Sequence, residues 1–214
     1  MPDLSLLFDS AAARTLDARA SALAGDDGWG LMSQAGLAAW QCLLQQWPDA
    51  RQLCVVAGGG NNGGDGYVLA THALQSGRQV RLFALAGKPP ATVLARQAAA
   101  AFTDAGGQVE TVDGALPACD LLVDALFGLG LDRAPEGDAR ALIEAINAQD
   151  APVFALDVPS GVDADRGQVP GVAVRAQVTL QFIANHRGLF TGGALDHVGQ
   201  RRLAPLELDD AAWE

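Results

Sequence analysis

The chain has 214 residues, of which 50% are hydrophobic and 18% are charged. A chain of this length forms one large domain or two small ones, and its apolar content excludes intrinsic disorder as the main state. Acidic residues outnumber basic residues by 25 to 14, which gives a formal charge of -11. Nucleic-acid binding through phosphate neutralisation is therefore not expected. Lys88 is the only lysine of the chain.

Neither a membrane segment nor a secretory signal is expected. No run of the sequence approaches the roughly 18 apolar residues that a membrane-spanning helix needs. The first nine residues carry acids and no basic side chain, unlike a signal peptide. Cys42, Cys54 and Cys119 are odd in number and lack zinc-binding spacing, so we expect reduced thiols and a cytoplasmic location.

Predicted helices and strands alternate along most of the chain. Most of the expected strands are short, continuous apolar runs, which are typical of strands that are covered on both faces. In chain order we expect helices over residues 10–23 and 29–47, a strand over 53–57, a helix over 64–76, a strand over 80–86, a helix over 92–105, strands over 108–112 and 121–126, a helix over 138–148, and strands over 153–156 and 177–183.

This alternation predicts an α/β fold with a mostly parallel, doubly wound sheet, because parallel neighbours are joined by right-handed helical crossovers. No linker, repeat or low-complexity segment divides residues 1–214, which we interpret as a single domain. Ligands bind outside the carboxyl ends of the strands in such sheets. Residues that directly follow each strand are therefore the first candidates for a site.

The segment after the first expected strand, residues 58–66, holds six glycines, two asparagines and Asp65. Glycines allow a backbone to approach a ligand closely, and the N-terminus of the following helix offers free N–H groups to an anion. A plain turn needs neither the amides nor the acid, so we favour ligand binding. The segment also matches GxGxxG, but no acid ends the second strand to hold a ribose, which disfavours a hydride-transferring dehydrogenase.

Oxygen-bearing side chains follow two later strands. Asp124 lies within or at the end of one apolar run, Asp157 directly follows the next strand, and Ser160 lies in the turn after it. Such residues are ordinary in caps and turns, but at neighbouring strand ends, together with Asn62, they offer hard oxygen ligands to a cation. The sequence therefore places a candidate polar site at this edge of the sheet.

Five motifs, in this order and spacing, resemble the NAD(P)H-hydrate epimerase family, whose domain is of the YjeF N-terminal type. They are LMSQAG at 31–36, GGGNNGGDGYVLA at 58–70, DALFGLGLDR at 124–133, ALDVPSGVDADRG at 155–167 and FIANHRGLFTG at 182–192.

The resemblance implies a Rossmann-like, three-layer α/β/α sandwich and an isomerase. The activity it implies is interconversion of the R and S forms of hydrated NADH and NADPH, which carry water at C6 of the nicotinamide ring. It also implies one potassium ion per subunit and a homodimer. The implied repair step feeds an S-specific, ADP- or ATP-dependent dehydratase, which many bacterial relatives carry as a C-terminal domain. The sequence of this chain ends at Glu214.

Carried over residue by residue, the resemblance implies a potassium site and a substrate site. The implied potassium ligands are Asn62, Asp124 and Ser160. The implied substrate contacts are Asn61, Asn62, Gly63, Gly64, Asp65, Gly128, Leu129, Gly130, Leu131, Asp132, Arg133, Ala134 and Asp157.

We expect Asp157 to be the catalytic acid–base group, because a carboxylate can protonate a departing hydroxyl and deprotonate incoming water. The closing loop usually carries a lysine in the family, whereas this chain has His186 followed by Arg187. We expect Arg187 to supply charge to a phosphate, and His186 to relay protons beside Asp157. Loop packing is the alternative role of His186.

The alternative to an enzyme is a non-catalytic nucleotide- or protein-binding scaffold of the same fold. Retention of Asn62, Asp124, Asp157 and Ser160 favours the enzyme, because a scaffold does not need all four. With no acid at the end of the second strand, we expect hydrated NADH and NADPH to be used with similar efficiency.

Overall fold

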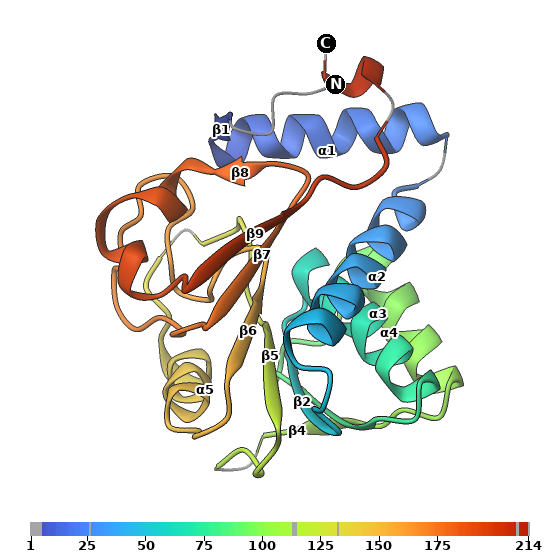
Figure 1. The fold of residues 1–214 in the computed structure, drawn as a ribbon, viewed down its shortest axis with the longest axis vertical. Coiled ribbons are helices and arrows are strands. Elements are labelled where there is room, and N and C mark those ends of the chain that lie inside the picture. Colours follow the sequence, from blue (N-terminus) through green and yellow to red (C-terminus); the bar gives the residue numbers. More distant parts are fainter. Residues whose placement is uncertain (1–5, 26, 113–114, 132, 209, 214) are drawn as a thin grey trace.

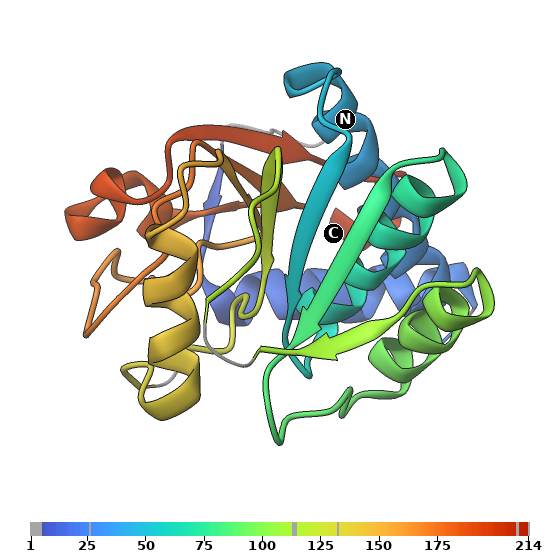
Figure 2. The ribbon, with the colours of Figure 1, turned by 90° about the horizontal axis from the view of Figure 1, so that it is seen from below.

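The computed structural model describes residues 6–25, 27–112, 115–131, 133–208 and 210–213. A seven-stranded parallel sheet runs through the middle of the molecule (Figures 1 and 2). Its strand order is β4-β3-β2-β5-β6-β7-β9. The strands are β2 (Gln52–Ala57), β3 (Gln79–Ala84), β4 (Val109–Thr111), β5 (Leu121–Ala125), β6 (Val153–Leu156), β7 (Val178–Phe182) and β9 (Gln200–Ala204).

Helices cover both faces of the sheet, which confirms the expected three-layer α/β/α fold (Figure 1). One face carries α2 (Trp29–Gln46), α3 (Asn61–Gln75) and α4 (Val93–Asp104). The other carries α5 (Gly137–Asn147) and the short 3-10 helices η1 (Arg187–Phe190) and η2 (Gly192–Asp196).

The N-terminal segment closes one end of the sheet. Helix α1 (Ser10–Ala24) lies across that end, and the 3-10 helix η3 (Asp210–Trp213) packs against it (Figure 1). The short strand β1 (Leu7–Phe8) pairs with β8 (Asn185–His186), which anchors the residues just before α1 beside the end of β7.

The winding of the sheet reverses between β2 and β5. From β2 the chain passes through α3 to β3 and through α4 to β4, and then returns to the opposite side of β2 as β5. Val56 of β2 lies in register with Phe83 of β3 and with Asp124 of β5. Such a switch point leaves a crevice outside the carboxyl ends of the strands, where ligands bind.

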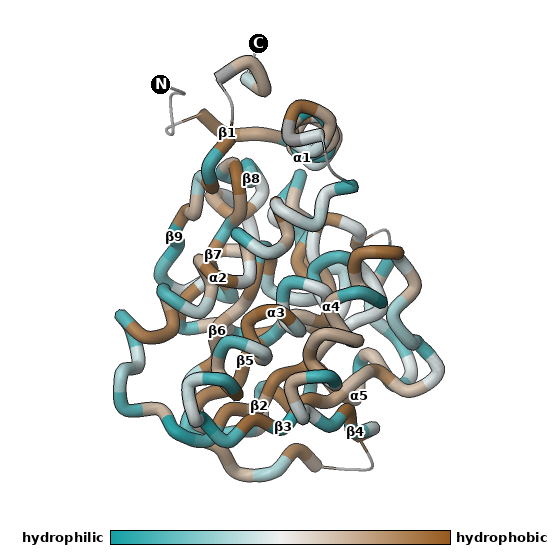
Figure 3. The backbone as a smooth tube through the Cα atoms, turned by 90° about the vertical axis from the view of Figure 1, so that its right-hand side faces the viewer, coloured by the Kyte–Doolittle hydropathy of each residue, from teal (hydrophilic) through white to brown (hydrophobic). Residues whose placement is uncertain are grey.

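Apolar side chains on both faces of the central strands form the core. Val55 of β2 packs with the cluster beneath α2 and α3, whereas the adjacent Val56 packs with the cluster beneath α5. Strands β2 and β5 are accordingly mostly hydrophobic, coloured brown in Figure 3. Burial on both faces explains why these strands are continuous apolar runs.

The structure differs from the sequence-based prediction in its additional strands and in the start of α3. The expected strands all form, but the two-residue strands β1 and β8 and the edge strand β9 were not predicted. The sequence of β9, QRRLA, is polar, and its side chains are exposed or partly exposed. Helix α3 begins at Asn61 instead of Gly64, so the asparagines belong to the helix and not to a loop. No helix in the described residues is long and apolar enough to cross a membrane.

Candidate functional site

A cavity of about 990 Å³ lies at the carboxyl ends of β2, β3, β5 and β6. Its walls are the start of α3, the segments that follow these strands, and one side of α1. Charged and polar side chains project into it from separate parts of the chain, among them Asp17, Asn62, Asp65, Asp157 and His186. The cavity therefore occupies the crevice that the winding of the sheet creates.

The glycine segment brings the N-terminus of α3 against the neighbouring backbone. A Cβ on Gly63 would overlap the carbonyl oxygen of Gly58, and a Cβ on Gly58 would overlap the carbonyl oxygen of Leu126. The N-cap of α3 is Gly60, which provides no side-chain hydrogen bond. The first N–H groups of α3 therefore have no side-chain cap at the cavity wall, as at an anion-binding helix terminus.

Gly63→Ala should lower the free energy of unfolding by about 1–3 kcal/mol, the usual cost of forcing extra volume into a close-packed region. Urea denaturation of the variant and the parent chain measures this difference. The matched control is Gly60→Ala, because a Cβ at Gly60 would meet no atom within 4 Å and its φ of -91° is accessible to alanine. Equal losses in the two variants would contradict the steric explanation.

A buried hydrogen-bond network joins the ends of β5 and β6. Asp124 is 0% exposed, and its Oδ1 and Oδ2 accept hydrogen bonds from the Ser160 hydroxyl at 2.6 Å and the Ser160 N–H at 2.8 Å. The Ser160 hydroxyl oxygen accepts from the Phe127 N–H at 2.8 Å. Burial raises the pKa of Asp124 to about 6, against the opposing effect of its hydrogen bonds from Ser160 and Leu126. An added cation would favour the ionised carboxylate.

Asn62 extends this network to α3. Its Nδ2 donates to the Phe127 carbonyl oxygen at 2.9 Å, and the Ser160 Oγ lies 3.3 Å from the same oxygen. The Asn62 Oδ1 is buried and has no hydrogen-bond partner among the described residues. A buried acceptor without a partner is costly unless a ligand satisfies it. Asn62, Asp124 and Ser160 therefore fit an oxygen-coordinated cation.

The donor set also limits which cation can bind. In the described part of the chain, no three His, Cys, Asp or Glu side chains cluster as metal ligands do. Asp124 supplies the single carboxylate, and neutral oxygens supply the rest. Such a set suits a weakly charged hard cation better than zinc or a tightly bound calcium ion.

Asp157 and His186 form the second polar centre. The Asp157 Oδ1 lies 2.7 Å from the Nε2 of His186, whose side chain is 1% exposed. Asp157 adopts a left-handed backbone conformation with φ of 64°, and its N–H donates to the Leu180 carbonyl at 2.7 Å. The His186 N–H is held by the Gln181 Oε1 at 2.7 Å. The backbone N–H groups of both residues are thus held in place beside the cavity.

The two centres share one wall of the cavity. A Cβ on Gly128 would lie 2.9 Å from the Asp157 Oδ2 and 3.2 Å from the Cβ of Asn62. Only a glycine fits between them without displacing a side chain. The carboxylate of Asp157 and the amide of Asn62 therefore flank the same backbone position.

Two further carboxylates surround Asp157. Burial raises the pKa of Asp65 well above its usual value, and the charges of Asp157 and Asp17 raise it further. The pKa of Asp17 is raised by desolvation in the cavity and then by Asp157. Like charges that cannot all ionise together favour one protonated acid beside one ionised carboxylate.

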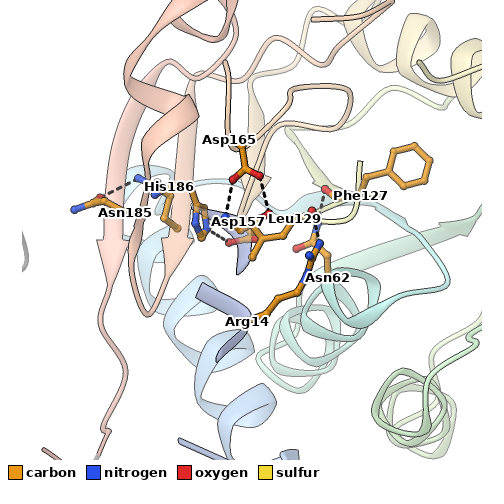
Figure 4. A network of polar contacts seen from close by, with 10 residues as sticks. Arg14, Asn62, Phe127, Leu129, Asp157, Asp165, Asn185 and His186 are labelled. Atoms are coloured by element: carbon orange, nitrogen blue, oxygen red, sulfur yellow. Dashed lines mark hydrogen bonds and ion pairs between the residues drawn. The ribbon is translucent and has the colours of Figure 1, made fainter. Parts of the chain in front are cut away.

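Helix α1 is tied to the loops around the cavity (Figure 4). Arg14 donates from Nη2 to the Leu129 carbonyl oxygen at 2.7 Å. The carboxylate of Asp165 accepts from the Ser10 N–H at 2.6 Å and from its hydroxyl at 2.8 Å. These bonds hold α1 over the cavity and hold the loop after β5 in place.

The structure brings most of the predicted site residues to this cavity. Asp132 lies outside the described residues. Gly63, Gly64, Asp124 and Ser160 lie behind the cavity wall, and the first two are buried within α3. The predicted residues that line the cavity itself are Asn61, Asn62, Asp65, Gly128, Leu129, Gly130, Leu131, Arg133, Ala134, Asp157 and His186.

Arg187 does not have the environment expected for a phosphate ligand. Its Nε donates to the Asp165 carbonyl oxygen at 3.1 Å and its Nη1 lies 3.7 Å from the Asp9 carboxylate. It is not among the residues that line the cavity. Arg187 instead connects η1 to the loop that carries Asp165 and to Asp9, the N-cap residue of α1.

Sequence reasoning missed five charged residues of the cavity. Arg14 and Asp17 come from α1, Lys88 comes from the connection between β3 and α4, and Glu136 and Asp138 come from the start of α5. The position of α1 depends on the pairing of β1 with β8 and on the bonds from Ser10 to Asp165, which span 155 residues. The one available signal was Lys88, because it follows a predicted strand at the edge where ligands bind.

The fold and cavity define a doubly wound α/β protein with a buried Asp124–Ser160 hydrogen-bond network and an Asp157–His186 pair at the switch point of its sheet. Residues 29–188 match the family described as YjeF-related protein N-terminus, and the chain belongs to that family.

Curated relatives carry two kinds of name. The bifunctional NAD(P)H-hydrate repair enzyme Nnr of Escherichia coli is 43% identical over 84% of this chain, which spans 35% of that enzyme. The NAD(P)H-hydrate epimerases of Bordetella bronchiseptica and Limosilactobacillus fermentum are 41% and 38% identical over 88% and 79% of this chain, and 84% and 82% of theirs. The chain thus spans about a third of the bifunctional relative and most of the epimerases.

A solved structure has the same fold. The crystal structure of the yeast protein ynu0, YNL200c, superposes with a TM-score of 0.81, covering 97% of this chain and 91% of the yeast chain at 20% sequence identity.

Proposed function

We propose that this chain is an isomerase that interconverts the R and S forms of hydrated NADH and NADPH. Family membership and the relatives named NAD(P)H-hydrate epimerase support the activity. The observation that carries the proposal is the bond of 2.7 Å between Asp157 and the buried His186, which forms an acid–base pair inside a nucleotide-sized cavity at the switch point.

The reaction requires a proton to be delivered and another to be taken up. As the C6–OH bond breaks, its electron pair leaves on oxygen, which gains a proton and departs as water. The lone pair of the ring nitrogen forms an iminium cation in its place. Water then adds to the opposite face of C6 and loses a proton, which restores the hydrate with inverted configuration.

The cavity offers groups for each need. The carboxylate of Asp157, 2.7 Å from His186, can accept the proton of the incoming water and offset the positive charge of the iminium cation. Asp65, whose pKa is raised by burial and by Asp157, can hold the proton that the departing hydroxyl requires. His186 orients Asp157 and can relay its proton.

The dinucleotide would bind along the carboxyl edge of the sheet. The N-terminus of α3, from Asn61 to Gly63, offers N–H groups and partial positive charge to the pyrophosphate. The loop after β5, which includes Gly130 and Arg133, covers the cavity from the other side. Loop residues 128–131, 133 and 134 therefore form the second half of the proposed nucleotide site.

We also propose that one potassium ion binds to Asn62, Asp124 and Ser160. The unpartnered Asn62 Oδ1 and the buried Asp124 carboxylate support this assignment. A cation there would compensate the buried charge and supply positive potential to the nucleotide phosphates.

Asp124→Ala should weaken potassium binding and nucleotide binding together, because the cation and the loop carrying Phe127 share the Asp124–Ser160 network. Calorimetric titration with NADPH at fixed ionic strength, in potassium and in tetramethylammonium chloride, measures both effects. Nucleotide affinity that is independent of potassium in the parent chain and unchanged in Asp124→Ala would rule out the proposed ion site.

The oligomeric state, the cellular location and the functional partner are also proposals. We propose a homodimer that acts in the cytoplasm, supported by the family resemblance and by the free thiols of Cys42, Cys54 and Cys119. The name of the bifunctional relatives supports coupling to an S-specific dehydratase that uses ADP or ATP.

The activity is tested by mixing the chain with purified R-form hydrate, an S-specific dehydratase and its nucleotide, and following reduced cofactor at 340 nm. We expect reduced cofactor to form faster than in the mixture without the chain, which measures uncatalysed epimerisation. Equal rates would leave the chain as a non-catalytic nucleotide- or protein-binding scaffold.

A further inference from the structure

Lys88 projects from the connection between β3 and α4 into the cavity wall. A tight turn places it there: its N–H donates to the Leu85 carbonyl at 3.0 Å, and Gly87 adopts a φ of 66°. Its ammonium forms no ion pair or hydrogen bond with any other residue that the structure describes, and it is exposed. The lysine charge is thus available to a ligand.

The Lys88 turn is fixed beside the glycine segment at the start of α3. The Ala91 N–H donates to the Gly59 carbonyl oxygen at 2.8 Å. A Cβ on Gly59 would lie 2.7 Å from the Pro89 carbonyl oxygen, so the two backbones are in direct contact. Lys88 therefore occupies a defined place next to the proposed pyrophosphate site.

The strand order sets out the proposed groups in sequence along the carboxyl edge. Lys88 follows β3, the glycine segment follows β2, Asp124 is the next-to-last residue of β5, and Asp157 follows β6, in the spatial order β3-β2-β5-β6. Strands β3 and β6 are thus separated by about 14 Å at the usual spacing of about 4.8 Å. With the nicotinamide at Asp157 and the pyrophosphate at α3, the adenosine half extends toward Lys88.

We propose that Lys88 binds the 2′-phosphate of the adenosine ribose, so that this chain prefers hydrated NADPH to hydrated NADH. This inference rests on the proposed function. In doubly wound dinucleotide sites, an acid at the end of the second strand holds the ribose hydroxyls, whereas a cation accommodates a 2′-phosphate. The corresponding residues here, 84–88, include no acid and end in the only lysine.

The other cations of the cavity are placed differently. The guanidinium of Arg14 is bonded to the Leu129 carbonyl at 2.7 Å. Arg133 belongs to the loop after β5, on the opposite side of β2 from β3. Similar use of the two hydrates was expected from the missing acid alone, and that expectation did not take Lys88 into account.

The single lysine allows a direct binding test. Reductive dimethylation with 13C-formaldehyde labels Lys88 and the N-terminal amine and retains their positive charge. The labelled chain is titrated with ADP-ribose and with 2′-phospho-ADP-ribose, with dissociation constants from calorimetry on the unlabelled chain. We expect the phosphorylated ligand alone to shift the Lys88 resonance strongly and to bind about tenfold tighter, which is about 1.4 kcal/mol.

Three variants test whether Lys88 is the residue that causes the preference for the 2′-phosphorylated ligand. Lys88→Met should bring the affinity ratio close to one by weakening only the phosphorylated ligand, and Lys88→Arg should largely retain it. Arg19→Met removes an exposed charge outside the cavity lining and should leave the ratio unchanged. Equal weakening of both ligands in Lys88→Met, which would indicate a pyrophosphate contact, or an unchanged ratio would overturn the proposal.

Epimerase activity does not enter this measurement. A chain that shows the expected preference but does not epimerise either hydrate refutes the proposed function and leaves the Lys88 assignment standing. A chain that epimerises both hydrates and binds both ligands equally refutes the Lys88 assignment alone. Failure to bind either ligand refutes the Lys88 assignment, and the coupled dehydratase assay then decides the proposed function by itself.

Discussion

Asp157→Asn is expected to lower kcat by about 10²- to 10⁴-fold, the range typical of a lost general acid–base group. The amide retains the shape of the side chain but cannot accept a proton from incoming water or offset the charge of an iminium cation. Because Asp157 is bonded to His186 at 2.7 Å and is only 14% exposed, bulk water cannot readily replace it. The coupled dehydratase assay gives kcat and KM for the variant.

A variant of His186, the hydrogen-bond partner of Asp157, provides the control. His186→Gln preserves a hydrogen-bond donor near Asp157 but removes the titrating imidazole, so a relay role predicts a lower kcat and an altered pH profile. A role in packing alone predicts neither change in a folded variant. Near-normal turnover in Asp157→Asn would transfer the acid–base role to another group.

The strand-end residues could be predicted because they depend on local patterns. The apolar runs of β2, β5 and β6 identify strands buried on both faces, and Asp124 and Asp157 come at the ends of two of them. Since parallel strands end at a common edge, the pattern was sufficient to place Asp124 beside Ser160.

The remaining features depend on contacts between distant segments. Gly63 and Gly64 have low helix propensity, so the sequence pattern did not predict that α3 includes them. Both positions require glycine because Gly58 and Met32 pack against them and leave no space for a larger side chain. Asp17 reaches the cavity only because α1 is tied to Asp165 and to the end of β7 through β1 and β8. No local pattern encodes those contacts.

Asp65→Asn is expected to lower kcat/KM by about 10²- to 10⁴-fold at neutral pH if Asp65 is the general acid. Burial and the charges of Asp157 and Asp17 raise its pKa, which favours the protonated form that a general acid needs. Activity must then fall as the pH rises through the pKa of Asp65, because the acid form disappears. The pH profile of kcat/KM for the parent chain should show this alkaline limb, and Asp65→Asn should lack it.

Asp17→Asn provides the matched control, because it removes a negative neighbour of Asp65 without removing the acid. Loss of that charge makes ionisation of Asp65 easier, so the pKa of Asp65 should fall and the alkaline limb should move to lower pH. Its kcat at the optimum should change far less than in Asp65→Asn. If instead Asp65→Asn keeps the alkaline limb and changes only KM, Asp65 binds the substrate, and the proton for the departing hydroxyl comes from Asp157 and His186.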